Sequence, residues 1–344
     1  MHYGFNALWM FVDFGKPAPP PDLKMLDFMA AHDLNFIRLP TDYRFWTAGT
    51  DYTRPDESVL RILDSYVDES RSRGLHVSLN LHRAPGYCVN QNDLESHNLW
   101  VDAEAQDGFA GIWAILAERY RSIPAEDLSF DLLNEPPPVG QYEMTRANHD
   151  AIIRRTIAAI RAVSPDRPIT VDGLGYGNVP LPELADTGVT QSCRGYVPFA
   201  LTHYGASWAD TSAFPPPVWP GLEWADSTWT IESLRAHYEP WRDLESADAG
   251  TGGSKASDRG SARAAVHVGE FGCYNKTPND VAMAWFRDLF ALYHEYRWGY
   301  ALWNFEGAFG VVEHGRPGAR YEDYRGYMVD RELLGLFLDS RVQE

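Results

Sequence analysis

Two glutamates in this chain occupy similar positions, each at the end of a short apolar run. Glu135 ends the run SFDLLNEP, and Glu270 ends the run VHVGEFG. If both runs are buried strands, their carboxyl groups can belong to one site. Hydrolysis of a glycosidic bond with retention requires such a pair, one group as acid and base and the other as nucleophile. We therefore predict that Glu135 and Glu270 are catalytic.

The elements that would position these glutamates alternate regularly along the chain. Eight short apolar segments are predicted strands: 3–8, 34–39, 75–81, 128–133, 168–172, 197–202, 265–270 and 299–304. Predicted helices lie between and after them, at 22–32, 56–73, 104–122, 144–163, 181–187, 228–245, 278–296 and 331–338. Eight strands, each followed by a helix, predict an α/β fold that closes as a (β/α)8 TIM barrel. Residues 1–344 fit one such domain.

Other polar and aromatic residues fall at or just beyond the predicted strand ends. In a barrel these ends converge on one mouth, where active sites lie. A polar residue that ends an apolar strand is unfavourable to bury without a partner. A shared site at the mouth therefore explains the set together: Arg38, His82, Asn134, His203, Tyr204 and Trp303.

Each of these residues also has a structural interpretation when it is taken alone. Arg38 could form an ion pair with Asp42, and Asn134 could form a turn before the prolines that follow. The two histidines could be hydrogen-bonded residues at strand ends, and Tyr204 and Trp303 could fill the core. The two glutamates could each cap a loop. Joint placement on one rim favours the functional interpretation.

Composition narrows the class of ligand. The net charge is −18, from 30 Lys and Arg against 48 Asp and Glu, which disfavours nucleic acid and anionic membrane surfaces. Runs of about 20 apolar residues, the length that crosses a bilayer, do not occur. Metal-binding HExxH, HxH and CxxC spacings are also lacking, so we predict no metal and no cofactor. A neutral oligosaccharide is the expected partner, and the oligomeric state is left open.

Three further features concern the setting of the domain. The opening MHYGFNALWM has neither a basic region nor an apolar region long enough for a signal peptide, so we expect a cytoplasmic protein, or a secreted one if a leader has been removed. Segment 246–263, rich in Gly, Ser, Asp and Ala without periodicity, predicts a flexible loop. The cysteines (Cys88, Cys193 and Cys273) are odd in number and predict no disulfide framework.

The motifs LLNEP and VHVGEFG, together with FIRLP, LNLHRAPG and GYALWNFEGAFG, resemble family 5 of the glycoside hydrolases. This is a cellulase-type family of eight-fold barrels, and the resemblance runs from Gly4 to about Phe337 with the motifs in order. It implies that Glu135 is the general acid and base, and that Glu270 is the nucleophile of a double-displacement reaction.

The resemblance also implies roles in substrate binding. Asn134 would hydrogen-bond the sugar 2-OH, and Arg38 would keep the carboxylate of Glu270 ionised. His82 would bind hydroxyls in the subsite for the cleaved sugar, and Trp303 would form the floor of that subsite.

The sixth strand of the family carries a histidine and, two residues later, a tyrosine that donates to the nucleophile. His203 in ALTHYGASW resembles that histidine. Gly205 stands where the tyrosine is expected, and Tyr204 is its neighbour. The sequence therefore predicts either a bulged strand end, which lets Tyr204 reach Glu270, or another donor.

These observations predict a retaining β-glycosidase that acts on short gluco- or manno-configured β-1,4 oligosaccharides. Long loops at 9–20, 41–55, 83–102 and 205–227 can close one end of a groove, which favours exo action of the β-mannosidase or β-glucosidase type. An endo-β-1,4-glucanase with an open cleft is the alternative. A carbohydrate-binding barrel without catalysis is a third possibility, but it has no need of two carboxylates that repel each other.

Overall fold

A closed barrel forms the centre of the protein. The computed structural model describes residues 1–11, 15–47, 49–246 and 265–342. In these ranges eight parallel strands pair side by side, and the last pairs with the first. In barrel order they are β1 (Tyr3–Asn6), β2 (Phe36–Asp42), β3 (His76–Ala84), β5 (Leu128–Asp131), β6 (Ile169–Asp172), β7 (Thr190–Gly195), β10 (Val266–Phe271) and β11 (Gly299–Leu302). The predicted (β/α)8 barrel is confirmed.

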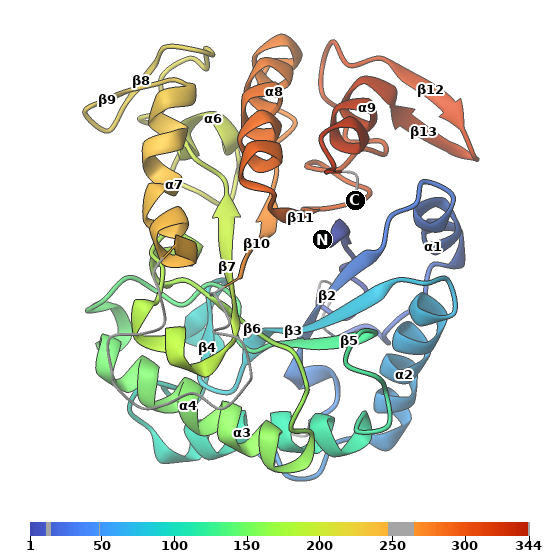
Figure 1. Cartoon of the computed structure of the whole chain (residues 1–344), viewed down its shortest axis with the longest axis vertical. Helices are drawn as coiled ribbons and strands as arrows, with labels where there is room; N and C mark the ends of the chain where they lie inside the picture. Colours follow the sequence, from blue (N-terminus) through green and yellow to red (C-terminus); the bar gives the residue numbers. More distant parts are fainter. Residues whose placement is uncertain (12–14, 48, 247–264, 343–344) are drawn as a thin grey trace.

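Helices surround the strands on the outside (Figure 1). They are α1 (Leu23–Ala30), α2 (Glu57–Arg71), α3 (Ala103–Arg119), α4 (Arg146–Val163), α7 (Ile231–Ser246), α8 (Asn279–Tyr296) and α9 (Arg331–Asp339). The connections contain the short helices α5 (Leu174–Gly177) and α6 (Phe199–Thr202), the hairpin β8 (Leu222–Trp224) with β9 (Ser227–Trp229), and the ribbon β12 (Tyr321–Tyr324) with β13 (Tyr327–Asp330). The two-residue strand β4 (Tyr87–Cys88) pairs antiparallel with β3.

Side-chain caps determine where several helices begin. The carboxylate of Asp56 accepts from the backbone N–H of Ser58 at 2.8 Å and opens α2. Thr145 and Asn148 form a reciprocal capping box at the start of α4. After α2, Gly74 adopts a φ of +76°, a left-handed conformation that glycine adopts readily. These local signals explain why the predicted helices agree closely with the observed ones.

The predicted sixth strand is wrong. The run 197–202 predicts a strand, but Phe199–Thr202 is helix α6, and the sixth barrel strand is Thr190–Gly195, with the sequence TQSCRG. This strand pairs in parallel with β6 and with β10. Its residues are mostly polar, so no apolar run marks it.

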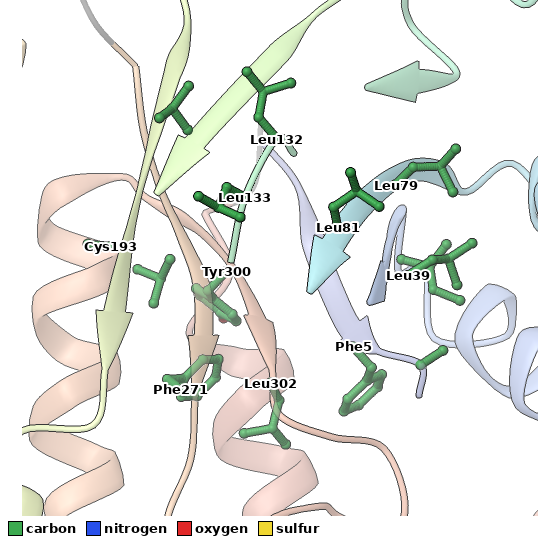
Figure 2. Packing of buried hydrophobic residues seen from close by; sticks show 14 of the residues in the cluster. Phe5, Leu39, Leu79, Leu81, Leu132, Leu133, Cys193, Phe271, Tyr300 and Leu302 are labelled. Carbon is green, nitrogen blue, oxygen red and sulfur yellow. The ribbon is translucent and has the colours of Figure 1, made fainter. Parts of the chain in front are cut away.

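The polar character of that strand reflects a polar barrel interior. Strand side chains alternate between two faces. Along β3, Leu79 and Leu81 pack in the hydrophobic cluster (Figure 2), whereas Ser78 lines a cavity of about 500 Å³ at the amino-terminal end of the barrel. That cavity is also lined by inward residues of the other strands, including Arg38, Ser129, Asp131, Thr170 and Ser192. The apolar core therefore lies between the strands and the helices, and the barrel itself holds polar groups.

Packing in this outer layer fixes the strands that carry the site. Phe271, the last residue of β10, is fully buried and its ring lies 5.5 Å from that of Phe290 in α8. Figure 2 shows Phe271 beside Tyr300 of β11, and their rings are 5.6 Å apart. Burial of one such side chain contributes about 1.5–3 kcal/mol. The packing of Phe271 therefore fixes the end of β10, which carries Glu270.

Three sequence predictions concern features other than the barrel itself. Apart from Ser246, the predicted loop 246–263 lies outside the described residues. Across the described ranges, no helix combines the length and the apolar character needed to cross a membrane. Cys88, Cys193 and Cys273 are buried free thiols.

Candidate active site

A cavity of about 660 Å³ opens at the carboxyl ends of the barrel strands. Five of the predicted site residues line it: His82, Glu135, His203, Glu270 and Trp303. Arg38 and Asn134 lie beneath it, almost completely buried. The structure thus brings seven of the eight predicted residues to one mouth, the exception being Tyr204.

Glu135 is held in an unusual backbone conformation just after β5. Its φ is +48°, in the left-handed region that side chains other than glycine rarely adopt. Its N–H donates to Asp172 Oδ2 at 2.9 Å, and its carbonyl accepts from the hydroxyl of Tyr87 at 2.6 Å. These two bonds stabilise the conformation, which directs the Glu135 side chain into the cavity. That side chain is 15% exposed.

Glu270 is more deeply enclosed. The pairing of β10 with β7 shifts register between Val268 and Glu270, which re-aims the strand end. Oε1 accepts from a guanidinium nitrogen of Arg38 and from Nη2 of Arg194 at 3.3 Å, while Oε2 accepts from the hydroxyl of Tyr196 at 3.2 Å. Three donors therefore surround a carboxylate whose side chain is 4% exposed.

The two glutamates experience different electrostatic environments. Burial, followed by the negative charge of Glu270, raises the pKa of Glu135 from 4.5 to about 7, although Arg194 opposes the rise. Glu270 is placed against two guanidinium groups, from Arg38 and Arg194. Burial and the charge of Glu270 also raise the pKa of Tyr196 well above its ordinary value, so its hydroxyl remains a donor. Glu135 can therefore hold a proton near neutral pH, while two guanidinium groups face Glu270.

His82, Asn134 and Trp303 form one unit, in which His82 and Trp303 line the cavity and Asn134 lies beneath it. The amide nitrogen of Asn134 donates to His82 Nε2 at 3.2 Å, so the ring carries its proton on Nδ1, which donates to Asn80 Oδ1 at 3.2 Å. The His82 ring stacks on Trp303 with 5.2 Å between centroids. Burial and then Arg38 lower the pKa of His82 well below 6.5, so the imidazole is neutral.

Arg38 does not form an ion pair with Asp42, which was the structural interpretation of this arginine taken alone. Arg38 Nε donates to Asp131 Oδ2 at 2.6 Å, and its other nitrogens contact Asn134 and Glu270. Asp42 pairs instead with Arg44, at 2.6 Å. Arg38 therefore lies at the floor of the site, in contact with Glu270.

His203 and Tyr204 do not end a strand. His203 follows α6, stacks on Phe199 with 4.0 Å between ring centroids, and lines the cavity as part of an apolar wall. Burial lowers the pKa of His203 to about 3. Tyr204 is not among the described residues that line the cavity, and the hydroxyl that donates to Glu270 belongs to Tyr196. Of the two alternatives for the donor to Glu270, the structure contains the second, a donor other than Tyr204, because the sixth strand ends at Gly195 and Tyr196 follows it.

Sequence reasoning missed Arg194 and Tyr196. Arg194 lies at the end of the true sixth strand, and Tyr196, two residues later, directly follows it. This is the spacing that the resemblance expects for a histidine and a tyrosine. The signal was the string RGY after an alternating polar segment, which an apolar pattern does not detect. Two buried acids were also missed, Asp131 beside Arg38 and Asp172 beside Arg194.

Comparisons with known proteins agree with this geometry. The family model described as cellulase, glycosyl hydrolase family 5, matches residues 3–308. Endoglucanase C of Acetivibrio thermocellus is 26% identical over 301 residues, covering 82% of this chain and 83% of that protein. A crystal structure described as a glycoside hydrolase is 53% identical, with a TM-score of 0.93 and 99% of each chain covered. Thermotoga maritima Cel5A in complex with mannotriose has a TM-score of 0.73 at 18% identity, covering 98% of this chain and 97% of that one, which indicates a shared fold.

Proposed function

This chain belongs to glycosyl hydrolase family 5, and we propose that it is a retaining β-glycosidase that removes sugar from an end of short β-1,4-linked oligosaccharides of gluco or manno configuration. One observation carries the proposal. Arg194 contacts the carboxyl groups of both Glu135 and Glu270, but burial raises the pKa of Glu135 to about 7, whereas Glu270 also pairs with Arg38. Environments that separate two carboxyl groups in this way assign one as acid and the other as nucleophile.

In the first step, a carboxylate oxygen of Glu270 attacks the anomeric carbon. The bond from that carbon to the leaving oxygen breaks, and Glu135 transfers its proton to that oxygen. Arg38 and the hydroxyl of Tyr196 hold the nucleophile in place before attack. The products are a glycosyl ester of Glu270 and a neutral leaving group.

In the second step, Glu135 is a carboxylate and removes a proton from water. The hydroxide attacks the anomeric carbon, the ester bond breaks, and Glu270 regains its carboxylate. Two inversions give net retention. Asn134 is placed by the guanidinium groups of Arg38 and Arg194, at 2.9 and 2.8 Å, where its amide nitrogen can bind the sugar 2-OH.

An aromatic side chain supports action at an end of the substrate. The ring of Phe11 lies 4.0 Å from that of His82 and 6.5 Å from that of Trp303. If these two residues bind the cleaved sugar, Phe11 restricts the space for a further sugar on that side. A cavity of about 660 Å³ is also within the range of volumes that small-ligand sites have.

An endo-β-1,4-glucanase is the second candidate, and the name of the Acetivibrio relative favours it. The two candidates differ in their products. Incubation with matched cello-, manno- and xylo-oligosaccharides of increasing length, followed by mass spectrometry, separates them. Stepwise release of one mono- or disaccharide from one series is expected, and a spread of intermediate lengths would favour the endoglucanase.

The catalytic assignment has its own test. Glu270→Ala is expected to abolish turnover of an aryl glycoside while oligosaccharide binding, measured by calorimetry, is retained. The exposed substitution Glu239→Ala in α7 is the control and should be as active as the wild type. Turnover by Glu270→Ala close to that of the control would refute the mechanism. Binding without turnover by the wild type would indicate a carbohydrate-binding barrel instead.

A further inference from the structure

Arg194 is the residue through which the acidic groups of the site are connected. Its Nε donates to Glu135 Oε1 at 2.9 Å, and its Nη2 donates to Glu270 Oε1 at 3.3 Å and to Asn134 Oδ1 at 2.8 Å. The same guanidinium also pairs with Asp172. The Arg194 side chain is 1% exposed, so these contacts are screened little by solvent.

The surrounding backbone leaves room for this side chain. A Cβ added to Gly177 would lie 2.4 Å from Cγ of Arg194, and one added to Gly269 would lie 2.9 Å from its Nη1. Gly177 also has a φ of +78°. The two glycines, from α5 and β10, let the backbone enclose the side chain closely, and Asp172 and Ser192 hold its guanidinium by hydrogen bonds. Its contact with Glu135 is therefore built into the fold.

Among the described residues, the positive charge in contact with Glu135 is that of Arg194. Arg38 lies deeper, where it pairs with Asp131 and Glu270. The titratable groups facing Glu135 come from several elements: Tyr87 of β4, Asp172 of β6, Tyr176 of α5, Arg194 of β7, Tyr196 after β7, and Glu270 of β10. Of these, Glu270 changes its charge during the proposed reaction.

We propose that Arg194 is a positioning residue that fixes Oε1 of Glu135, leaves Oε2 to exchange the proton, and favours the carboxylate of Glu135 once Glu270 is esterified. This inference rests on the proposed function. While Glu270 is ionised, its negative charge offsets Arg194 and Glu135 keeps its proton for the leaving group. Formation of the ester removes that negative charge, and Arg194 remains. Glu135 is then stabilised as the base that the second step needs.

The test compares Arg194→Gln, Arg194→Lys and the surface control Arg235→Gln in pH profiles of kcat/KM and in kcat. Loss of the positive charge should move the basic limb of kcat/KM upward by about one pH unit or more. A dinitrophenyl glycoside has a leaving group that needs no acid, so Arg194→Gln should still form the glycosyl-enzyme and release a burst of dinitrophenolate. Its steady-state rate, which depends on the second step, should fall at least ~10-fold. Arg194→Lys should keep the basic limb near that of the wild type.

A folded Arg194→Gln protein with an unchanged basic limb and an unchanged steady-state rate would overturn the proposal. If that variant does not fold, Arg194→His replaces it, since a histidine is neutral above about pH 7. Titration of ¹³C-labelled glutamate carboxyls by NMR, with Glu135→Gln for assignment, is the second measurement. Because it needs no turnover, it tests Arg194 even if the wild type hydrolyses no glycoside, a result that would refute the proposed function alone.

Discussion

Replacing Glu135 by glutamine is expected to stabilise the protein at neutral and alkaline pH. Glu135 is a carboxyl group whose pKa rises from 4.5 to about 7 on folding, chiefly because it is buried and then because Glu270 is near. Between these two values the folded protein holds a proton that the unfolded chain has lost. Folding stability therefore falls as the pH rises through this window, and it stays lower above it.

The size of the effect follows from the same pKa. A rise from 4.5 to about 7 corresponds to about 3 kcal/mol at pH 8. Gln has nearly the shape of the protonated acid and does not titrate, so Glu135→Gln should match the wild type near pH 4.5 and exceed it by up to about 3 kcal/mol at pH 8. Burial also raises the pKa of Asp131 to about 7, but Asp131 is present in both proteins and its effect cancels.

Urea unfolding monitored by tryptophan fluorescence at pH 4.5, 6 and 8 measures the difference. Glu239→Gln, an exposed glutamate of α7, is the matched control and should track the wild type at every pH. Equal pH dependence in the wild type and in Glu135→Gln would refute the reasoning, because it would mean that Glu135 is ionised in the folded protein. Activity should be lost in Glu135→Gln in either case.

Three further substitutions probe residues in and around the site. Phe11→Ala should shift the products toward disaccharide in the mass-spectrometric profile, and an unchanged profile would remove the support for a closed end. Trp303→Ala removes the ring on which His82 stacks and should lower kcat/KM by roughly 10- to 100-fold, mainly through KM. Gly177→Ala should destabilise the protein by about 1–3 kcal/mol in urea unfolding, because of its left-handed φ and its contact with Arg194. Gly188→Ala, at a φ of +67° with no atom within 4 Å of the added Cβ, is its control and should lose less.

The helices were predictable because their signals are local. The cap formed by Asp56, the capping box at Thr145 and the stop at Gly74 lie within a few residues of the ends that they define. The strands that consist of apolar runs were predictable for the same reason, because the run itself is a local signal. The positions of the two glutamates were also predictable, because a carboxyl group at the end of an apolar strand is unfavourable to bury unless it has a partner or a function.

The misplaced sixth strand shows where local patterns fail. Parallel strands were expected to be apolar on both faces, but this barrel is polar inside, so a strand such as TQSCRG has only its outward face in the core. The apolar run 197–202 is therefore the segment that the sequence predicts as the strand. Tyr204 is then the tyrosine nearest to the predicted strand end, whereas Tyr196 donates to Glu270 in the structure. Hydrogen-bond pairing with β6 and β10 decides the strand, and those partners are distant in sequence.

The sequence by itself determined the family, the barrel and the two carboxyl groups, since these depend on residue types and on their order along the chain. The tertiary structure alone decided which charges surround those groups. Arg194 lies 59 residues from Glu135 and 76 from Glu270, and its bonds to both exist only because three strand ends meet at one mouth. The pKa of Glu135 depends on burial and on those distances, which are properties of the folded chain.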